Sequence, residues 1–265
     1  MAIQAVLFDL DDTLLWDHRS VEEAFQATGE EAAKQVAGLT PDRLIESVRH
    51  EARALYESFE TFPFTKMIGI NPFEGLWANF TGGSQQEFRK LQALAPGYRK
   101  EAWTRGLRAL GVENAALGAW LAERFPAERR NRPYVYEETF RVLDALKGQV
   151  KLLLLTNGAP DLQQEKIDGV PQLAGYFDHI VISGTFGEGK PAESIFRHAM
   201  GLLGIEAAEG LMVGDKLTTD ILGSNRVGMP NAWVNRSGAV RTGEIVPANE
   251  VSHLEQLHAI IERLA

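Results

Sequence analysis

The residues best suited to chemistry are carboxylates that follow an apolar stretch near the start of the chain. Residues 3–9 read Ile-Gln-Ala-Val-Leu-Phe-Asp and are followed by Leu10-Asp11-Asp12-Thr13. Two carboxylates two positions apart, just past a buried strand, can converge on one point as the chain turns. Such a pair binds a divalent cation or divides the roles of nucleophile and acid. The same pattern also fits an ordinary Asp-rich turn.

A second acidic cluster lies late in the chain, in Gly214-Asp215-Lys216-Leu217-Thr218-Thr219-Asp220. Asp215 ends a predicted strand, and Asp220 falls about where a helix begins. One carboxylate is suited to bind a metal directly, while the other acts through water or braces the loop. The structural alternative for Asp220 is a helix N-cap.

Two further segments offer groups that bind anions. In Thr156-Asn157-Gly158, a hydroxyl and an amide follow an apolar run, where they can hydrogen-bond a phosphoryl oxygen near a helix start. Lys190 ends the Gly-containing loop 187–191. Each segment alone is more often structural, as an Asn-Gly turn or a solvated lysine. Together with the acidic clusters they supply the groups that Mg²⁺-dependent phosphoryl transfer needs.

The four segments each follow a predicted strand, so we expect them at one edge of a sheet. Short apolar runs suit strands that are buried on both faces of a parallel sheet. Between them, Tyr136–Leu146, Ala192–Leu203 and Val251–Leu264 repeat apolar residues at helical spacing. This alternation predicts an α/β fold, a doubly wound Rossmann-like parallel sheet. The predicted strands are Ile3–Asp9, Val150–Leu155, His179–Ser183, Leu211–Gly214 and Asn231–Val234.

Residues 17–132 contain no comparable strand run and predict an inserted all-helical domain. An insertion after the first strand lies where open α/β sheets bind ligands, so we expect a cap; a separate helical interaction domain is the alternative. The expected domains are an α/β catalytic core of 1–16 and 133–265 and a helical cap of 17–132. The predicted cap helices are Ser20–Gly38, Pro41–Phe59, Ser84–Leu94, Lys100–Leu110 and Asn114–Phe125.

The composition narrows the classes of function. The 265 residues include 27 Lys+Arg and 36 Asp+Glu, a net charge of −9, and no cysteine. This balance argues against nucleic acid as a partner, and the lack of Cys excludes thiol nucleophiles and Cys-ligated metals. We interpret the basic stretch Glu128–Arg132 as a solvated helix end. No apolar run is long enough to span a membrane, and Met1–Gln4 lacks a signal-type start, so we expect a cytoplasmic protein with no membrane partner.

In order and spacing, the four segments resemble the motifs of the haloacid dehalogenase superfamily of phosphohydrolases. The resemblance covers about 1–15 and 133–265, and the helical insertion resembles the mobile cap of one branch. Residues 154–158 with 163–167 look most similar to small-metabolite phosphatases, among them the acylneuraminate 9-phosphatase and pyrimidine nucleotidase groups. The matching residues are Asp9-x-Asp11-x-Thr13, Thr156, Lys190 and Gly214-Asp215-x-x-x-x-Asp220.

The resemblance implies catalytic and phosphate-binding roles for the matched residues. Asp9 is the implied nucleophile, which forms an aspartyl-phosphate. Asp11 is the implied general acid, which protonates the leaving alcohol, activates water and lies against the phosphate. Thr156 and Asn157 are implied to hold the phosphoryl oxygens. Lys190 is implied to neutralise developing charge and to restrain Asp9.

The resemblance also implies a Mg²⁺ site. Its ligands are Asp9, the backbone carbonyl of Asp11 and the carboxylate of Asp215, with Asp220 as a brace or a water-mediated ligand. Asp11 separates two chemistries, because the dehalogenases that name the family attack carbon and lack an Asp at this position. The presence of Asp11 therefore favours a phosphatase over a dehalogenase.

We expect a phosphatase acting on a small soluble phosphomonoester, with Mg²⁺ as cofactor. Phosphoserine, phosphoglycolate, a sugar or acylneuraminate phosphate and a nucleoside monophosphate are the candidate substrates. A phosphotransferase or phosphomutase would use the same motifs, and a non-catalytic interaction protein is a third class. The motifs leave a monomer and a homodimer equally open.

Overall fold

The structure is a computed structural model that describes residues 2–241 and 243–264. Its contacts divide the chain into two compact units. The α/β unit comprises Met1–Trp16, Val135–Gly158 and Val170–Ala265, and the helical unit comprises Asp17–Tyr134 and Ala159–Gly169. These units differ from the predicted domains at residues 133–134 and 159–169. The division into a catalytic core and a cap stays a prediction.

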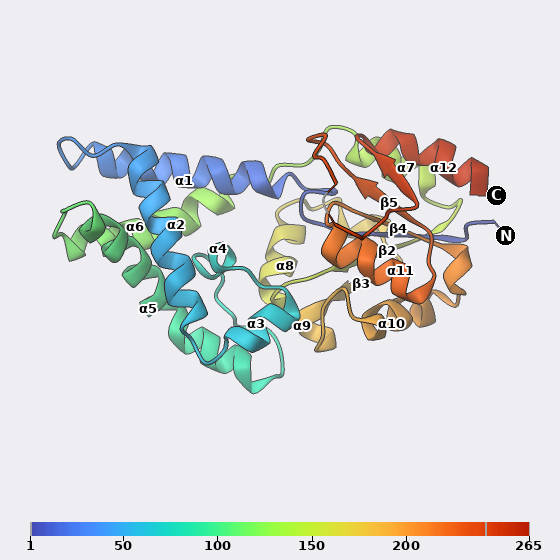
Figure 1. The fold of residues 1–265 in the computed structure, drawn as a ribbon, viewed down its shortest axis with the longest axis horizontal. Helices are drawn as coiled ribbons and strands as arrows, with labels where there is room; N and C mark the ends of the chain where they lie inside the picture. The colour runs from blue at the N-terminus through green and yellow to red at the C-terminus, as the bar shows by residue number, and fades with distance from the viewer. Residues whose placement is uncertain (1, 242, 265) are drawn as a thin grey trace. The chain divides into compact units, whose positions relative to one another are not determined.

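The α/β unit is built on a parallel sheet in the order β3-β2-β1-β4-β5-β6 (Figure 1). β1 lies between β2 and β4, with Ala5 opposite Lys151 on one side and Gly210 on the other. The five predicted strands are present, while β6 was not predicted because three residues, Asn-Glu-Val, give no apolar run. The strands are β1 (Ala5–Phe8), β2 (Lys151–Thr156), β3 (His179–Ile182), β4 (Gly210–Gly214), β5 (Asn231–Val234) and β6 (Asn249–Val251).

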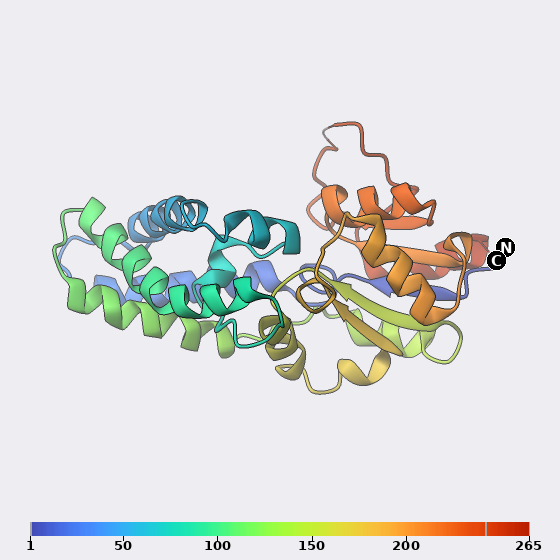
Figure 2. The ribbon, with the colours of Figure 1, turned by 90° about the horizontal axis from the view of Figure 1, so that it is seen from below.

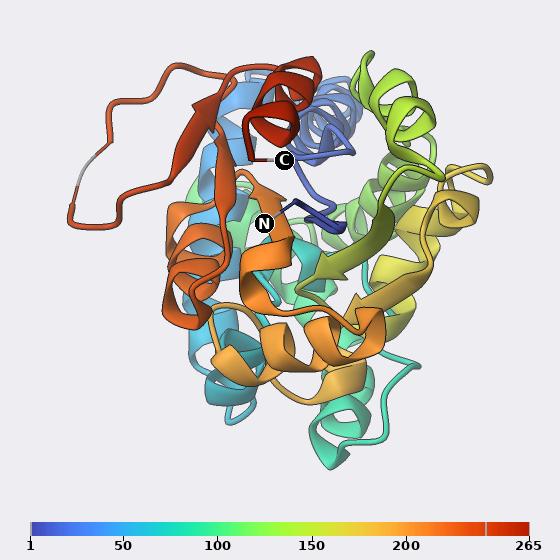
Figure 3. The same cartoon turned by 90° about the vertical axis from the view of Figure 1, so that its right-hand side faces the viewer.

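Helices cover both faces of this sheet, as a doubly wound fold requires (Figure 3). On one face, Ala5 and Leu7 of β1 share a core with Ile195, Phe196 and Ala199 of α10. The helices of this unit are α7 (Thr139–Leu146), α9 (Ser183–Phe186), α10 (Glu193–Leu203), α11 (Leu222–Val227) and α12 (Leu257–Leu264). Short turns of helix complete it: η1 (Ala174–Tyr176), η2 (Ala207–Glu209), η3 (Leu217–Ile221) and η4 (Leu254–Gln256).

In the helical unit, α1, α2, α5 and α6 pack side by side (Figures 1 and 2). Phe25, Trp103 and Phe125 are fully buried between them. α2 and α5 approach so closely that a Cβ on Gly106 would lie 2.4 Å from the Val48 side chain. The helices are α1 (Asp17–Ala33), α2 (Pro41–Glu57), α3 (Phe62–Ile68), α4 (Pro72–Gly75), α5 (Gln86–Ala109), α6 (Ala115–Arg130) and α8 (Pro160–Asp168).

Two expectations about this unit are wrong. Ser84–Leu94 and Lys100–Leu110 form one helix, α5, with Pro96 inside it. A proline inside a helix costs about 3 kcal/mol. Because buried residues keep their helical spacing before and after Pro96, the packing of that face offsets this cost.

The basic stretch at 128–132 is also not a fully solvated helix end. Arg129 is 4% exposed, its Nη2 lies 2.6 Å from Asp17 Oδ1, and its guanidinium covers the Trp77 ring at 4.6 Å. Glu128 is buried as well. The sequence prediction failed here because the partners of Arg129 are remote in the chain.

α8 follows β2 in the sequence yet belongs to the helical unit. Its Lys166 is buried, with Nζ 3.0 Å from Glu74 Oε1 and 3.7 Å from Asp17 Oδ1. The backbone N–H of Thr81 donates to the side chain of Asp161, which also lies in α8, at 2.8 Å. No helix in residues 2–241 and 243–264 is long and apolar enough to cross a membrane.

Candidate active site

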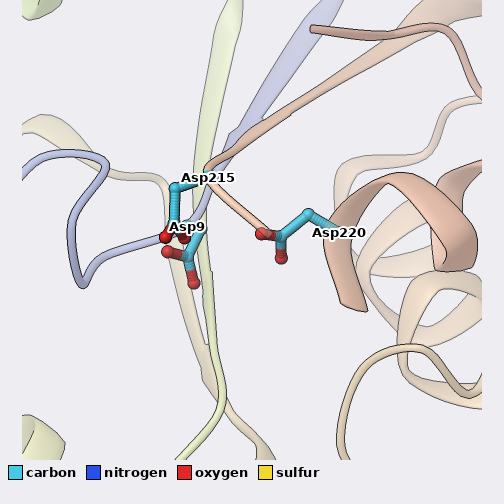
Figure 4. Close-up of side chains that lie close together, drawn as sticks. All are labelled: Asp9, Asp215 and Asp220. Atoms are coloured by element: carbon cyan, nitrogen blue, oxygen red, sulfur yellow. The ribbon is translucent and has the colours of Figure 1, made fainter. Parts of the chain in front are cut away.

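Two acidic loops meet at the carboxyl edge of the sheet. β1 ends at Phe8 and β4 at Gly214, and the two strands pair in register with Phe8 opposite Val213. Asp9 extends this pairing, because its backbone N–H donates to the Val213 carbonyl at 2.9 Å. Asp9 and Asp215 therefore leave adjacent strands at the same level. Figure 4 shows their carboxylates facing each other.

Asp220 joins them from the turn η3. One carboxylate oxygen from each of Asp9, Asp215 and Asp220 lies within 4.8 Å of the other two. The approach depends on Gly214, where a Cβ would lie 2.3 Å from Asp220 Oδ2. The Lys216 backbone N–H donates to that same oxygen at 3.0 Å. The Gly-Asp pair therefore ends the strand, supplies one carboxylate and leaves room for another.

Lys190 links this cluster into a buried ionic network. Its Nζ lies 2.6 Å from Asp9 Oδ1 and 2.7 Å from Asp220 Oδ1, and it donates to the Leu155 carbonyl at 2.7 Å. Burial alone would lower the pKa of Lys190, but Asp220 and Asp9 outweigh burial and raise it. Lys190 is thus held as a cation between the carboxylates of Asp9, in the loop after β1, and Asp220, in the turn η3.

Asn157 and Thr156 lie at the end of β2, beside β1. The Asn157 Nδ2 donates to the Lys190 carbonyl at 2.9 Å, and its Oδ1 accepts from the Lys190 N–H at 2.8 Å. Asn157 therefore orients the lysine loop. One amide hydrogen remains for another acceptor. Thr156 is buried at the same edge.

The remaining members of the first loop surround Asp9. Thr13 is buried, and its hydroxyl donates to Asp9 Oδ2 at 3.1 Å. Asp12 adopts a left-handed conformation with φ of 59°, which turns the chain after Asp11. This conformation suits Asp and Asn better than bulkier residues. Both oxygens of Asp9 are thus oriented, one by Lys190 and the other by Thr13.

The pKa values of two of these crowded carboxyl groups are raised. Burial, together with the charges of Asp9 and Asp220, raises the pKa of Asp215 well above its ordinary value. Burial also raises the pKa of Asp9, because Lys190 offsets the loss of solvation only in part. A cation among these groups would favour their ionised forms.

The donor set fits a divalent cation such as Mg²⁺. Asp215 Oδ1 is buried and has no hydrogen-bond partner among the residues that the structure describes. One carboxylate oxygen of Asp215 lies within 4.8 Å of carboxylate oxygens of Asp9 and Asp220. Hard cations prefer such oxygen ligands.

Lys216 is a neighbour of this cluster that the sequence analysis did not select. Burial lowers its pKa, but Asp215, Asp9 and Asp11 outweigh burial and raise it. The only signal in the sequence is its position directly after Asp215. The edge of the sheet therefore holds a second cation beside the acidic loops.

Comparisons with known proteins show which family and fold this chain resembles. A family model described as a haloacid dehalogenase-like hydrolase matches residues 3–228. The phosphoserine phosphatase of Thermus thermophilus is 32% identical over 255 residues, 96% of this chain and 98% of that protein. The N-acylneuraminate-9-phosphatase of Rattus norvegicus is 33% identical over 185 residues, 68% of this chain and 74% of that protein. The magnesium-bound HAD-hydrolase YfnB of Bacillus subtilis has the same fold, with a TM-score of 0.65 and 23% identity over 98% of this chain and 99% of that one.

Proposed function

We propose, from the premise that this chain belongs to the haloacid dehalogenase-like hydrolases and is a phosphatase, that it hydrolyses small phosphomonoesters with Mg²⁺ through an aspartyl-phosphate. One observation carries the proposal. Asp9 lies at the end of a central strand, oriented by Lys190 at 2.6 Å and Thr13 at 3.1 Å, with Asp215 beside it. This is how an activated carboxylate nucleophile is built.

The first half of the reaction transfers the phosphoryl group to Asp9. A carboxylate oxygen of Asp9 attacks phosphorus, and the bond from phosphorus to the substrate oxygen breaks. Asp11 gives its proton to that oxygen, so that the product leaves as a neutral alcohol. Lys190 fixes Asp9 and balances the charge that collects on the phosphoryl oxygens.

The second half returns Asp9 to its carboxylate form. Asp11 takes a proton from a water molecule, and the resulting hydroxide attacks phosphorus. The acyl-phosphate bond then breaks, releasing inorganic phosphate. Thr156 and the free amide hydrogen of Asn157 would donate to the phosphoryl oxygens in both halves. The contacts between Asn157 and the Lys190 backbone support an additional role for Asn157 in orienting the lysine.

Asp9, Asp215 and the backbone carbonyl of Asp11 are the groups that would hold Mg²⁺. When bound, the ion would neutralise their charge and that of the phosphate. Asp220 would be a brace, because its two oxygens already meet Lys190 Nζ and the Lys216 N–H. The unpartnered Oδ1 of Asp215 is consistent with a direct ligand.

We assign substrate choice to the helical insertion, as a cap domain of residues 17–132 that belongs to a catalytic core of 1–16 and 133–265. The two related proteins are named for a phosphoserine and an acylneuraminate 9-phosphate activity. We therefore keep a small phosphorylated metabolite as the substrate class. A cytoplasmic monomer or homodimer, with no nucleic-acid or membrane partner, completes the proposal.

The test is phosphate release from an aryl phosphate, measured with Mg²⁺ and with a chelator. We expect activity only with the metal, and none from Asp9→Asn, which keeps the shape of the side chain. Full turnover by Asp9→Asn would refute the nucleophile, and full turnover in chelator would refute the metal. A panel of phosphometabolites then ranks substrates, and a rearranged ester in place of free phosphate would indicate a mutase.

A further inference from the structure

The end of β5 and the turn that follows it contact both acidic loops. β5 is the neighbour of β4 and ends at Val234. The indole Nε1 of Trp233 donates to the backbone carbonyl of Asp215 at 2.7 Å. Trp233 is buried, so this bond forms away from competing water. A residue outside the four family motifs thus holds the loop that carries the Asp215 carboxylate.

Arg236 contacts the other loop three residues later. Its Nη2 donates to the Thr13 carbonyl at 3.0 Å, and its Nη1 pairs with the buried carboxylate of Glu138. The face of the guanidinium lies 3.6 Å from the centre of the Tyr136 ring. A planar guanidinium can make these three contacts at once, whereas a lysine ammonium cannot.

Asn235 fixes the turn that presents Arg236. Its backbone N–H donates to the Val251 carbonyl at 2.7 Å. Its side chain donates to the Ala239 carbonyl and accepts from the Ala239 N–H, both at 2.9 Å. The backbone on each side of Arg236 is therefore restrained, and the guanidinium starts from an ordered turn.

These contacts hold together two loops whose like charges repel each other. Asp9 and Asp215 bear like charges, and their loops must stay together even before a cation binds. Thr13, held by Arg236, donates its hydroxyl to Asp9. Trp233 in β5 and Arg236 in the turn after it donate to the two loops, and these bonds resist the separation that the repulsion favours.

We propose that Trp233 and Arg236 are positioning residues that hold the two acidic loops at the spacing required for metal binding and nucleophilic attack. The inference rests on the proposed function. Trp233 acts through the Asp215 backbone. Arg236 acts through Thr13 on Asp9.

The experiment compares Trp233→Phe and Arg236→Lys with two matched controls. Trp120→Phe changes an exposed tryptophan, and Arg197→Lys changes an exposed arginine that pairs with Glu193 at 2.8 Å. Turnover of an aryl phosphate gives kcat and KM, and calorimetric titration of each variant gives the Kd for Mg²⁺.

Each variant has its own expected outcome. Trp233→Phe keeps an aromatic ring but loses the indole N–H donor, so we expect the Kd for Mg²⁺ to rise about 3–10-fold. Arg236→Lys loses a charged donor, so we expect kcat to fall about 10–100-fold with KM nearly unchanged. Both controls should match the wild type.

Glu138→Gln separates positioning from simple stability. It weakens the ion pair but leaves the bond from Arg236 to Thr13, so its melting temperature should fall while kcat stays closer to the wild type than in Arg236→Lys. Equal losses of kcat in the two variants would refute the role through Thr13. If Arg236→Lys does not fold, Trp233→Phe decides, and a Kd for Mg²⁺ that matches that of Trp120→Phe would then refute the positioning role.

Asp9→Asn distinguishes the two levels of the proposal. Turnover by Asp9→Asn would refute the proposed function itself. A second outcome would refute the positioning role alone. In that outcome Asp9→Asn is inactive, while Trp233→Phe and Arg236→Lys match their controls in kcat and in Kd for Mg²⁺.

Discussion

Replacing Asp215 by Asn should make the metal-free protein more stable and remove its response to Mg²⁺. The amide keeps the shape of the side chain but removes a charge that Asp9 and Asp220 repel. The effect of this substitution therefore changes sign with the metal, which no loss of packing would produce.

The magnitude follows from the spacing. The three carboxylate oxygens lie within 4.8 Å of one another. One pair of unit charges at that distance repels by about 3.5 kcal/mol at an effective dielectric constant of about 20. Lys190 lies against Asp9 and Asp220 and cancels much of the field at Asp215. We therefore expect a net gain of about 1–2 kcal/mol in the free energy of unfolding, or roughly 2–8 °C in Tm.

The gain should depend on pH in a defined direction. The folded-state pKa of Asp215 is raised above its ordinary value of 3.8. At a pH below that value, Asp215 is protonated in both folded and unfolded wild type, so its charge costs nothing. As the pH rises from 3.8 through the folded-state pKa, the unfolded chain releases this proton more readily than the folded protein, so the stability of the wild type falls relative to the variant. The advantage of Asp215→Asn therefore grows from acid to neutral pH.

The assay is calorimetric unfolding in chelator and in excess Mg²⁺. Ligand at about 100 times its Kd stabilises a protein by roughly 2.7 kcal/mol, so Mg²⁺ should raise the Tm of the wild type and leave that of Asp215→Asn unchanged. In excess Mg²⁺, the order of the two Tm values should then be the reverse of their order in chelator. A variant that melts below the wild type in chelator, or that keeps its Mg²⁺ shift, would refute the reasoning.

Three further predictions concern other charges and one close approach. Lys190→Met should lower turnover at least about 100-fold and destabilise the fold by about 3–5 kcal/mol, measured by steady-state rates and urea unfolding. Gly214→Ala should cost about 1–3 kcal/mol, because the new Cβ would meet Asp220 at 2.3 Å; an unchanged Tm would contradict this. Lys166→Met and Glu74→Gln should each destabilise the helical unit by about 3 kcal/mol. The double variant should be destabilised by less than the sum of the two, as measured by urea unfolding followed by circular dichroism.

The residues that meet at the carboxyl edge of the sheet were predictable, because the sequence signal for each of them is local. A buried strand that ends in a polar residue specifies both the position and the level of that residue, as at Asp9 and Asp215. Parallel pairing then brings the ends together without further information. The α/β fold class and the five strands that carry the site followed from the same pattern.

The contacts that orient the site were not predictable, because they join remote parts of the chain. Asn157 binds the backbone of Lys190, and Trp233 binds the carbonyl of Asp215. Every residue type has the same backbone carbonyl, so a hydrogen bond to a backbone group leaves no signal in the sequence at the acceptor. Pro96 shows the converse, since a local signal for a break was overruled by packing along α5.

The charges of the site predict that metal binding and phosphate binding are coupled. With all three carboxyl groups ionised, Asp9, Asp215 and Asp220 together with Lys190 and Lys216 sum to one net negative charge, which a divalent cation would convert to one net positive charge. Inorganic phosphate should therefore bind weakly in chelator and at least about 10-fold more tightly with Mg²⁺. By linkage, bound phosphate should raise the affinity for Mg²⁺ by the same factor. Calorimetric titrations in both orders measure the two factors. Equal phosphate affinity with and without the metal would mean that lysines alone recognise the anion. The overall charge of −9 is compatible with an anionic substrate because the sign of the site changes locally when the cation binds.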